Sequence, residues 1–189
     1  FAAMKRREVY ASTGPRIVLR FFAAWDFLPD DIYRPDYIDI AYKQGVPMGA
    51  ELTKPDRRNA PRFMISAVKD PHGANLDRIQ VIKGWLDENG KSQEKIFDVA
   101  LSDDRKLSRL TGKAPEVGNT VIVSEATYSN SIGDAQLLSY WRDPEFDPDT
   151  PAFYYVRVLE IPTPRWTAYD ARFFNLDLPD DITMWQQER

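Results

Sequence analysis

Short runs of alternating apolar and polar residues, separated by turn-forming residues, recur through most of this chain. The run after Gly14-Pro15 sets the pattern, because Ile17, Leu19 and Phe21 are spaced two residues apart. Successive side chains of a β-strand point to opposite faces of its sheet, so this spacing predicts a strand with a buried face. Similar patterns predict strands at 36–43, 63–69, 78–86, 93–101, 120–128, 136–142 and 153–161.

About eight short strands with turns between them predict a mainly β protein, built as an antiparallel β-sandwich. The most specific local signal is Asn89-Gly90, which suits a hairpin turn with positive φ at both central residues. It predicts that 78–86 pairs with 93–101, and the charged stretch 102–118 is expected to be a long surface loop. We also expect a short helix at the start and short helical turns near the end, at 168–174 and 182–187.

Composition excludes several classes of function. The 25 Lys and Arg are outnumbered by 29 Asp and Glu, which argues against a general nucleic-acid binder. The chain has no Cys, and its only histidine, His72, rules out a multi-histidine zinc site made by this chain alone. It also has no apolar run long enough to span a membrane.

Two polar segments are weak candidates for chemistry. Four carboxylates lie between Asp143 and Asp149, and calcium prefers clustered oxygen ligands, so Asp143, Asp147 and Asp149 are its candidate ligands. Two prolines and the lack of a glycine there favour a solvated turn instead. His72 offers a general base, but Pro-His-Gly is a turn sequence, and a surface histidine is the commoner case.

The last predicted strand has two apolar faces. Tyr154, Val156 and Val158 form one face, and the opposite face carries Phe153, Tyr155, Arg157 and Leu159. Such a strand is either buried on both sides or presents aromatic residues to a partner. We favour a cover made by the C-terminal segment, with Trp166, Phe173, Phe174 and Trp185, over an open site rimmed by Arg16, Arg20 and Arg165.

Several segments together are similar to a known family. They are Gly45-Val46-Pro47-Met48-Gly49, the run Ile161-Pro162-Thr163-Pro164-Arg165-Trp166, and the ranges 7–16, 73–80, 118–120, 128–133 and 153–160. In combination they resemble the C-terminal third of a bacterial family of unknown function, DUF3604. The similarity runs nearly from end to end of the chain.

The resemblance implies a parent whose earlier part is a barrel of the polymerase-and-histidinol-phosphatase type, a metal-dependent hydrolase. Its metal, zinc or manganese, would be held by histidines and carboxylates outside this chain, which itself has no cofactor. Residues 1–14 would be the tail of that missing N-terminal barrel, 15–166 an accessory sandwich, and 167–189 an extension packing on it. On this basis the chain is a non-catalytic accessory β-domain with the barrel as its partner.

The residues nearest the missing barrel are candidates for interface or substrate-rim roles: Gly14, Pro15, Arg16, Arg157, Arg165 and Trp166. Two alternatives remain open. One is a stand-alone ligand-binding module, either calcium-assisted or with exposed aromatic rings that stack on sugars. The other is a homo-oligomer, in which the strip otherwise covered by the barrel pairs with a second copy.

Overall fold

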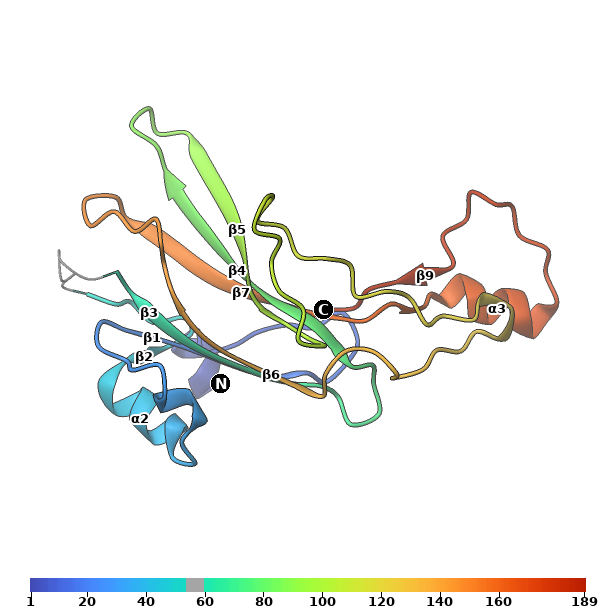
Figure 1. Cartoon of the computed structure of the whole chain (residues 1–189), viewed down its shortest axis with the longest axis horizontal. Helices are drawn as coiled ribbons and strands as arrows, with labels where there is room; N and C mark the ends of the chain where they lie inside the picture. The colour runs from blue at the N-terminus through green and yellow to red at the C-terminus, as the bar shows by residue number, and fades with distance from the viewer. Residues whose placement is uncertain (54–59) are drawn as a thin grey trace.

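The computed structural model describes residues 1–53 and 60–189, and it consists mainly of antiparallel strands in two facing sheets (Figure 1). The four-stranded sheet has the order β2-β1-β3-β6, and the three-stranded sheet has the order β5-β4-β7. Their strands are β1 (Val18–Ala24), β2 (Val46–Pro47), β3 (Arg62–Val68), β4 (Leu76–Leu86), β5 (Ser92–Leu101), β6 (Gln136–Arg142) and β7 (Ala152–Glu160). The predicted mainly β, antiparallel fold is confirmed.

The main core lies between the two sheets. Ile17, Leu19 and Phe21 point into it at the predicted spacing of two, and they meet Ile79 and Val81 of β4. Fully burying an aliphatic or aromatic side chain of this kind is worth roughly 1.5–3 kcal/mol. The alternation that predicted the first strand is therefore what joins the two sheets.

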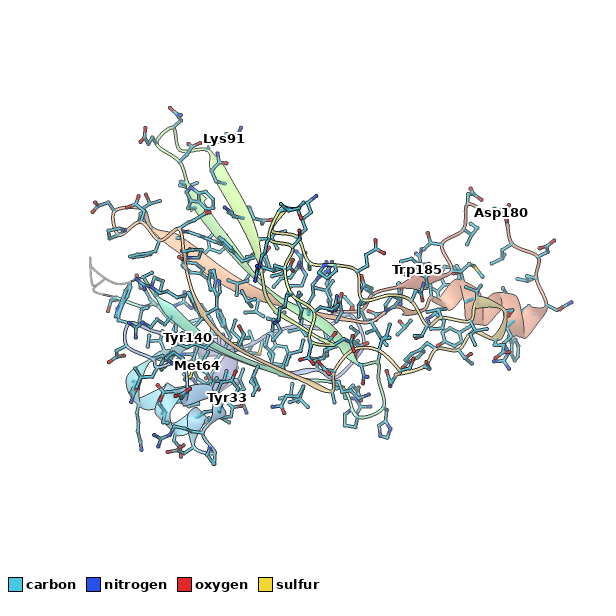
Figure 2. The ribbon with its side chains drawn as sticks, viewed as in Figure 1. Tyr33, Met64, Lys91, Tyr140, Asp180 and Trp185 are labelled. Atoms are coloured by element: carbon cyan, nitrogen blue, oxygen red, sulfur yellow. The ribbon has the colours of Figure 1, made fainter. Side chains whose placement is uncertain are left out.

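A second, smaller core covers the other face of the four-stranded sheet. Phe22 and Ala24 of β1 pack there with Phe27, Ile32 and other buried residues beneath the helices α2 (Tyr37–Gln44) and η1 (Asp31–Tyr33). Figure 2 shows Met64 of β3 and Tyr140 of β6 in this layer, near α2.

The strand expected at 36–43 is wrong, because this segment forms α2. Ile38, Ile40 and Tyr42 alternate, but Ile40 and Ala41 are the buried residues, and adjacent buried positions fit a helix face better than a strand. The helix ends at Gln44, and at the next residue, Gly45, a Cβ would lie only 2.5 Å from the carbonyl oxygen of Ala23. The chain can therefore return close to β1 only through glycine.

The predicted hairpin between β4 and β5 is confirmed, with Leu86 opposite Ser92. The turn type is different, because only Gly90 has a positive φ, of 73°, and the Gly90 N–H donates to the Asp87 carbonyl. This is a type I turn followed by a left-handed residue, the usual three-residue hairpin loop. The Asp87 carboxylate accepts the N–H groups of Asn89 and Lys91, which stabilises this loop.

Residues 102–118 form the expected irregular loop, and one arginine holds it against the sheet. The guanidinium of Arg105 donates to the Asp77 carboxylate at 2.6 Å and to the Pro115 carbonyl at 2.8 Å.

The strand expected at 120–128 is wrong. That segment contains the short helix η2 (Val123–Glu125) and a left-handed residue, Ala126, which the ladder of a regular strand does not accommodate.

The C-terminal part forms an arm, residues 163–186, that projects from the sandwich (Figure 1). It contains β8 (Thr163–Pro164), α3 (Trp166–Phe174) and β9 (Trp185–Gln186), and β8 pairs with β9. The helix at 168–174 is confirmed, but 182–187 holds β9 rather than a helical turn.

At the other end of the chain, α1 (Ala2–Lys5) is the predicted short helix. Among the described residues, no helix has both the length and the hydropathy needed to cross a bilayer.

Candidate functional site

A buried ion pair joins β4 of the three-stranded sheet to Asp143, the residue that follows β6 of the four-stranded sheet. Lys83 of β4 donates to the Asp143 carboxylate at 2.7 Å and to the Glu145 carbonyl at 2.6 Å. Tyr154 of β7 donates its hydroxyl to the same carboxylate at 2.7 Å. Burial and the Asp143 carboxylate raise the pKa of the Tyr154 phenol, so it remains a hydrogen-bond donor.

The side chains of the acidic segment 143–149 bond to other protein groups. Asp143 is the counter-ion of Lys83, while the Asp147 carboxylate accepts the Thr150 hydroxyl at 2.6 Å and the Asp149 N–H at 3.0 Å. The structure does not bring Asp143, Asp147 and Asp149 together as a ligand set. Outside 54–59, no group of three or more His, Cys, Asp and Glu side chains is placed to hold a metal ion.

Glu160 occupies a junction between β7 and the last residues of the chain. Its N–H donates to the Glu188 carbonyl at 2.9 Å, and the Gln187 amide donates to its carbonyl at 3.0 Å. Glu160 is 2% exposed, and its Oε1 has no hydrogen-bond partner within residues 1–53 and 60–189. Burial raises the pKa of the carboxyl to about 7, the negative charge of Glu188 adds to this, and Lys69 opposes it.

Two of the family-like segments interlock beside Glu160. The Asn75 side-chain amide donates to the carbonyls of Asn130, Ile132 and Gly133, at 3.0 to 3.2 Å. Gly133 has φ +75°, and a Cβ there would lie 2.6 Å from Ile161. These residues therefore hold two loops against the end of β7, which is a structural role.

Three of the predicted interface residues, Gly14, Pro15 and Arg16, lie at this junction. The Arg16 N–H donates to the Asp70 carboxylate at 2.8 Å, and a Cβ on Gly14 would lie 4.0 Å from the Glu188 carboxyl carbon. Just before them, the Thr13 N–H donates to the Arg189 carbonyl at 2.7 Å. Whether these residues face a partner domain stays a prediction.

An open groove lies between β1 of the four-stranded sheet and β7, an edge strand of the three-stranded sheet. It has a volume of about 570 Å³ and is lined by β1, by β7 including Arg157, and by residues 9–13. Tyr10 lies across it, because its hydroxyl donates to the Ile17 carbonyl and accepts the Leu19 N–H. The groove is mostly apolar, with few polar groups, as ligand pockets commonly are. A neighbouring hollow of about 530 Å³ is lined partly by Trp25 and Phe146.

Arg165 and Trp166 lie at the start of the arm, where the guanidinium sits 6.0 Å from the centre of the indole ring. The arm is ordered from within. Arg165 N–H donates to the Met184 carbonyl, the Thr167 hydroxyl donates to the Thr183 carbonyl, and Ala168 is fully buried. Arg172 also reaches the Glu125 carbonyl in η2.

The apolar face of α3 points outward. Trp166 is 62% exposed, Tyr169 50% and Phe173 82%, and their spacing of three and four residues places them on one side of the helix. In a surface helix such a stripe normally faces the core. Figure 2 shows Trp185 in the same arm, away from both sheets, and it too is exposed.

The expected cover of the outer face of β7 is therefore wrong. Phe153 is 62% exposed and Tyr155 39%, so neither ring is buried by the C-terminal segment. Hydrogen bonds to Glu160 and Asp77 hold only the last residues, such as Gln187, against the sandwich. The stretch 163–186 needs few contacts with the sheets because β8, β9 and η2 already order it.

Sequence reasoning missed three polar residues that the structure singles out: Lys83, Glu160 and Tyr10. Lys83 follows Ile79 and Val81 on the core face, so a charge at that position was a detectable sign of a buried partner. Glu160 at the end of β7 gave no such sign, because its burial depends on residues far away in the sequence. Tyr10 could not be found for the same reason, since its hydroxyl bonds to Ile17 and to Leu19 of β1 across a turn.

Comparison with known proteins gives one match. A family model described as "Protein of unknown function (DUF3604)" matches residues 1–189. No curated protein and no solved structure matches the chain.

Proposed function

The chain belongs to the DUF3604 family, and we propose that it serves as a non-catalytic β-domain that docks onto the catalytic domain of a metal-dependent hydrolase. The observation that carries the proposal is the outward apolar stripe of α3, made by Trp166, Tyr169 and Phe173. Large exposed apolar patches mark interaction sites, and an amphipathic helix commonly docks its apolar face into a groove of its partner.

Two further points support this assignment. The resemblance described above implies a metal-binding barrel in the parent protein, and such a barrel would be a partner of the right kind. The residues described here do not fit such a metal, because no group of three possible ligands is placed together among them. We therefore assign the hydrolytic chemistry and its zinc or manganese ion to the partner, and a supporting role to this chain.

The test begins with the reading frame that encodes the chain. The proposal requires this frame to encode a domain rich in histidine and carboxylate ligands. That domain and the 189-residue chain, produced as separate polypeptides, should form a one-to-one complex in size-exclusion chromatography with light scattering. A reading frame without such a domain, or two polypeptides that do not associate, would refute the proposal.

Replacing Trp166, Tyr169 and Phe173 together by serine is expected to weaken this complex by about 100-fold or more, because a few aromatic residues usually supply most of the binding energy. Titration calorimetry measures the change. The three side chains are largely exposed, so the urea midpoint of the isolated chain should hardly move. Replacing Leu110, an exposed leucine in the 102–118 loop, by serine is the matched control and should leave the affinity unchanged.

Two other outcomes count against the proposal. If the isolated chain dimerises and the triple variant does not, the occupant of the α3 face is a second copy and not a catalytic domain. If the isolated chain binds one zinc or manganese ion and hydrolyses a phosphoester, the chain is itself an enzyme. Light scattering at several concentrations and a metal-supplemented hydrolysis assay distinguish these cases.

A further inference from the structure

The outer face of the three-stranded sheet carries a strip of apolar residues with polar residues beside it. Tyr154, Val156 and Val158 point into the core, so the alternate residues of β7, among them Phe153, Tyr155 and Arg157, point outward. Each of these outward residues lies opposite a residue of β4, which in turn lies opposite a residue of β5. The three rows across the sheet are Phe153-Gly84-Glu94, Tyr155-Ile82-Ile96 and Arg157-Gln80-Asp98.

The two aromatic rings in this strip are nearly parallel. The ring centres of Phe153 and Tyr155 lie 6.3 Å apart, and their planes differ by 14°. Gly84 allows this arrangement, because a Cβ at that position would lie 2.3 Å from the Cζ atom of Phe153. The glycine lets the Phe153 ring rest close to the sheet and remain 62% exposed. By contrast, Phe173 and Phe174 in the arm meet at 85°.

Hydrogen-bonding groups border the rings on both sides. The Tyr155 hydroxyl donates to the Glu94 carboxylate at 3.3 Å, and the Gln80 amide donates to the Asp98 carboxylate at 2.8 Å. Each carboxylate accepts several hydrogen bonds, so Glu94 and Asp98 retain capacity for further donors. The face therefore combines two parallel, partly exposed aromatic rings with hydrogen-bond acceptors beside them.

We propose that this face binds a neutral saccharide chain made of pyranose rings. A pyranose presents C–H groups on a flat face and hydroxyls around its edge. The electron-rich face of an aromatic ring attracts such C–H groups, and the flanking carboxylates accept the hydroxyls. A neutral chain is favoured, because this face has no excess of either charge: Arg157, in the same row as Asp98, and Arg78, 3.6 Å from the Asp98 carboxylate, offset Glu94 and Asp98. The inference does not depend on the docking role of α3.

The experiment is titration calorimetry of the 189-residue chain with cellohexaose, xylohexaose and mannohexaose, and with polygalacturonate as the anionic comparison. At least one neutral chain should bind with a millimolar or tighter dissociation constant, and polygalacturonate should not. Failure of all three neutral chains to bind at about 10 mM would overturn the proposal. Tighter binding of polygalacturonate would also overturn it.

Matched variants separate stacking from other causes. Phe153→Ala should weaken binding about tenfold or more, because it removes one stacking ring. Tyr155→Phe keeps the ring and loses only the bond to Glu94, so it should weaken binding less than about threefold and leave the fold intact. Phe173→Ala removes an even more exposed ring from the arm and should have no effect. Equal losses from all three variants would contradict a site on this face.

Discussion

Replacing Asp143 by alanine is expected to lower the free energy of unfolding by about 3–5 kcal/mol, because it leaves the ammonium group of Lys83 buried without a counter-ion. The loss also removes the acceptor of the Tyr154 hydroxyl and of the Glu145 N–H. Small domains have total stabilities of about 5–15 kcal/mol, so this one substitution should approach the unfolding limit. Urea unfolding followed by far-ultraviolet circular dichroism measures it.

A neighbouring ion pair provides the matched control. Lys95 contacts the Glu145 carboxylate, but both side chains are roughly half exposed, 44% and 49%. Exposed pairs contribute only about 0–1 kcal/mol, so Lys95→Met should have a small effect. If Asp143→Ala and Lys95→Met destabilise the protein equally, the buried pair does not hold the sheets together as described.

The double variant Lys83→Met with Asp143→Leu tests the cause. It removes both charges and fills the space with apolar atoms, so it should be more stable than Asp143→Ala alone. If the double variant is the less stable protein, shape and not charge pairing accounts for the loss.

Replacing Glu160 by glutamine is expected to remove a pH dependence of stability worth about 3 kcal/mol. In the unfolded chain this carboxyl ionises around pH 4.5, and in the folded protein its pKa is raised to about 7. Stability from this group is complete below pH 4.5, falls as the pH rises to about 7, and is constant above that. The variant lacks the titrating group and should not show this fall.

Urea unfolding of both proteins at pH values from about 4.5 to about 8 makes the comparison. The difference in free energy between the two proteins is the useful quantity, because it cancels the titration of the other carboxylates. Glu188→Gln is the control variant. It removes the nearby negative charge but leaves Glu160 buried, so it should reduce the fall without abolishing it. Parallel curves for wild type and Glu160→Gln would contradict the burial of this carboxyl.

Much of the fold could be predicted because the relevant signals are local. The spacing of Ile17, Leu19 and Phe21 predicted β1, and Asn89-Gly90 predicted the hairpin, since both depend on residues a few positions apart. The wrong strand at 36–43 shows the limit of that approach. The apolar positions of these eight residues fit both the helical and the strand period. The segment forms a helix because it packs on the face of β1 that carries Phe22 and Ala24.

The candidate sites were harder to predict, because they depend on contacts between distant segments. The pKa of Glu160 is set by its burial and by the charges of Glu188 and Lys69, which lie far away in the sequence, so no local pattern reveals it. The stripe of Trp166, Tyr169 and Phe173 was readable as apolar, but its direction was not. A sequence pattern shows that a face needs covering, and it does not show whether the cover belongs to the same chain.

The four-stranded sheet has clusters of buried apolar residues on both faces, whereas the outer face of the three-stranded sheet carries the exposed rings of Phe153 and Tyr155. Amide hydrogens of β3, at the centre of the doubly covered sheet, can therefore reach solvent only when both layers separate together. Amides of β5, at the edge of the other sheet, can exchange through local fraying. Hydrogen exchange should therefore be cooperative in the four-stranded sheet and local at the edge of the three-stranded sheet.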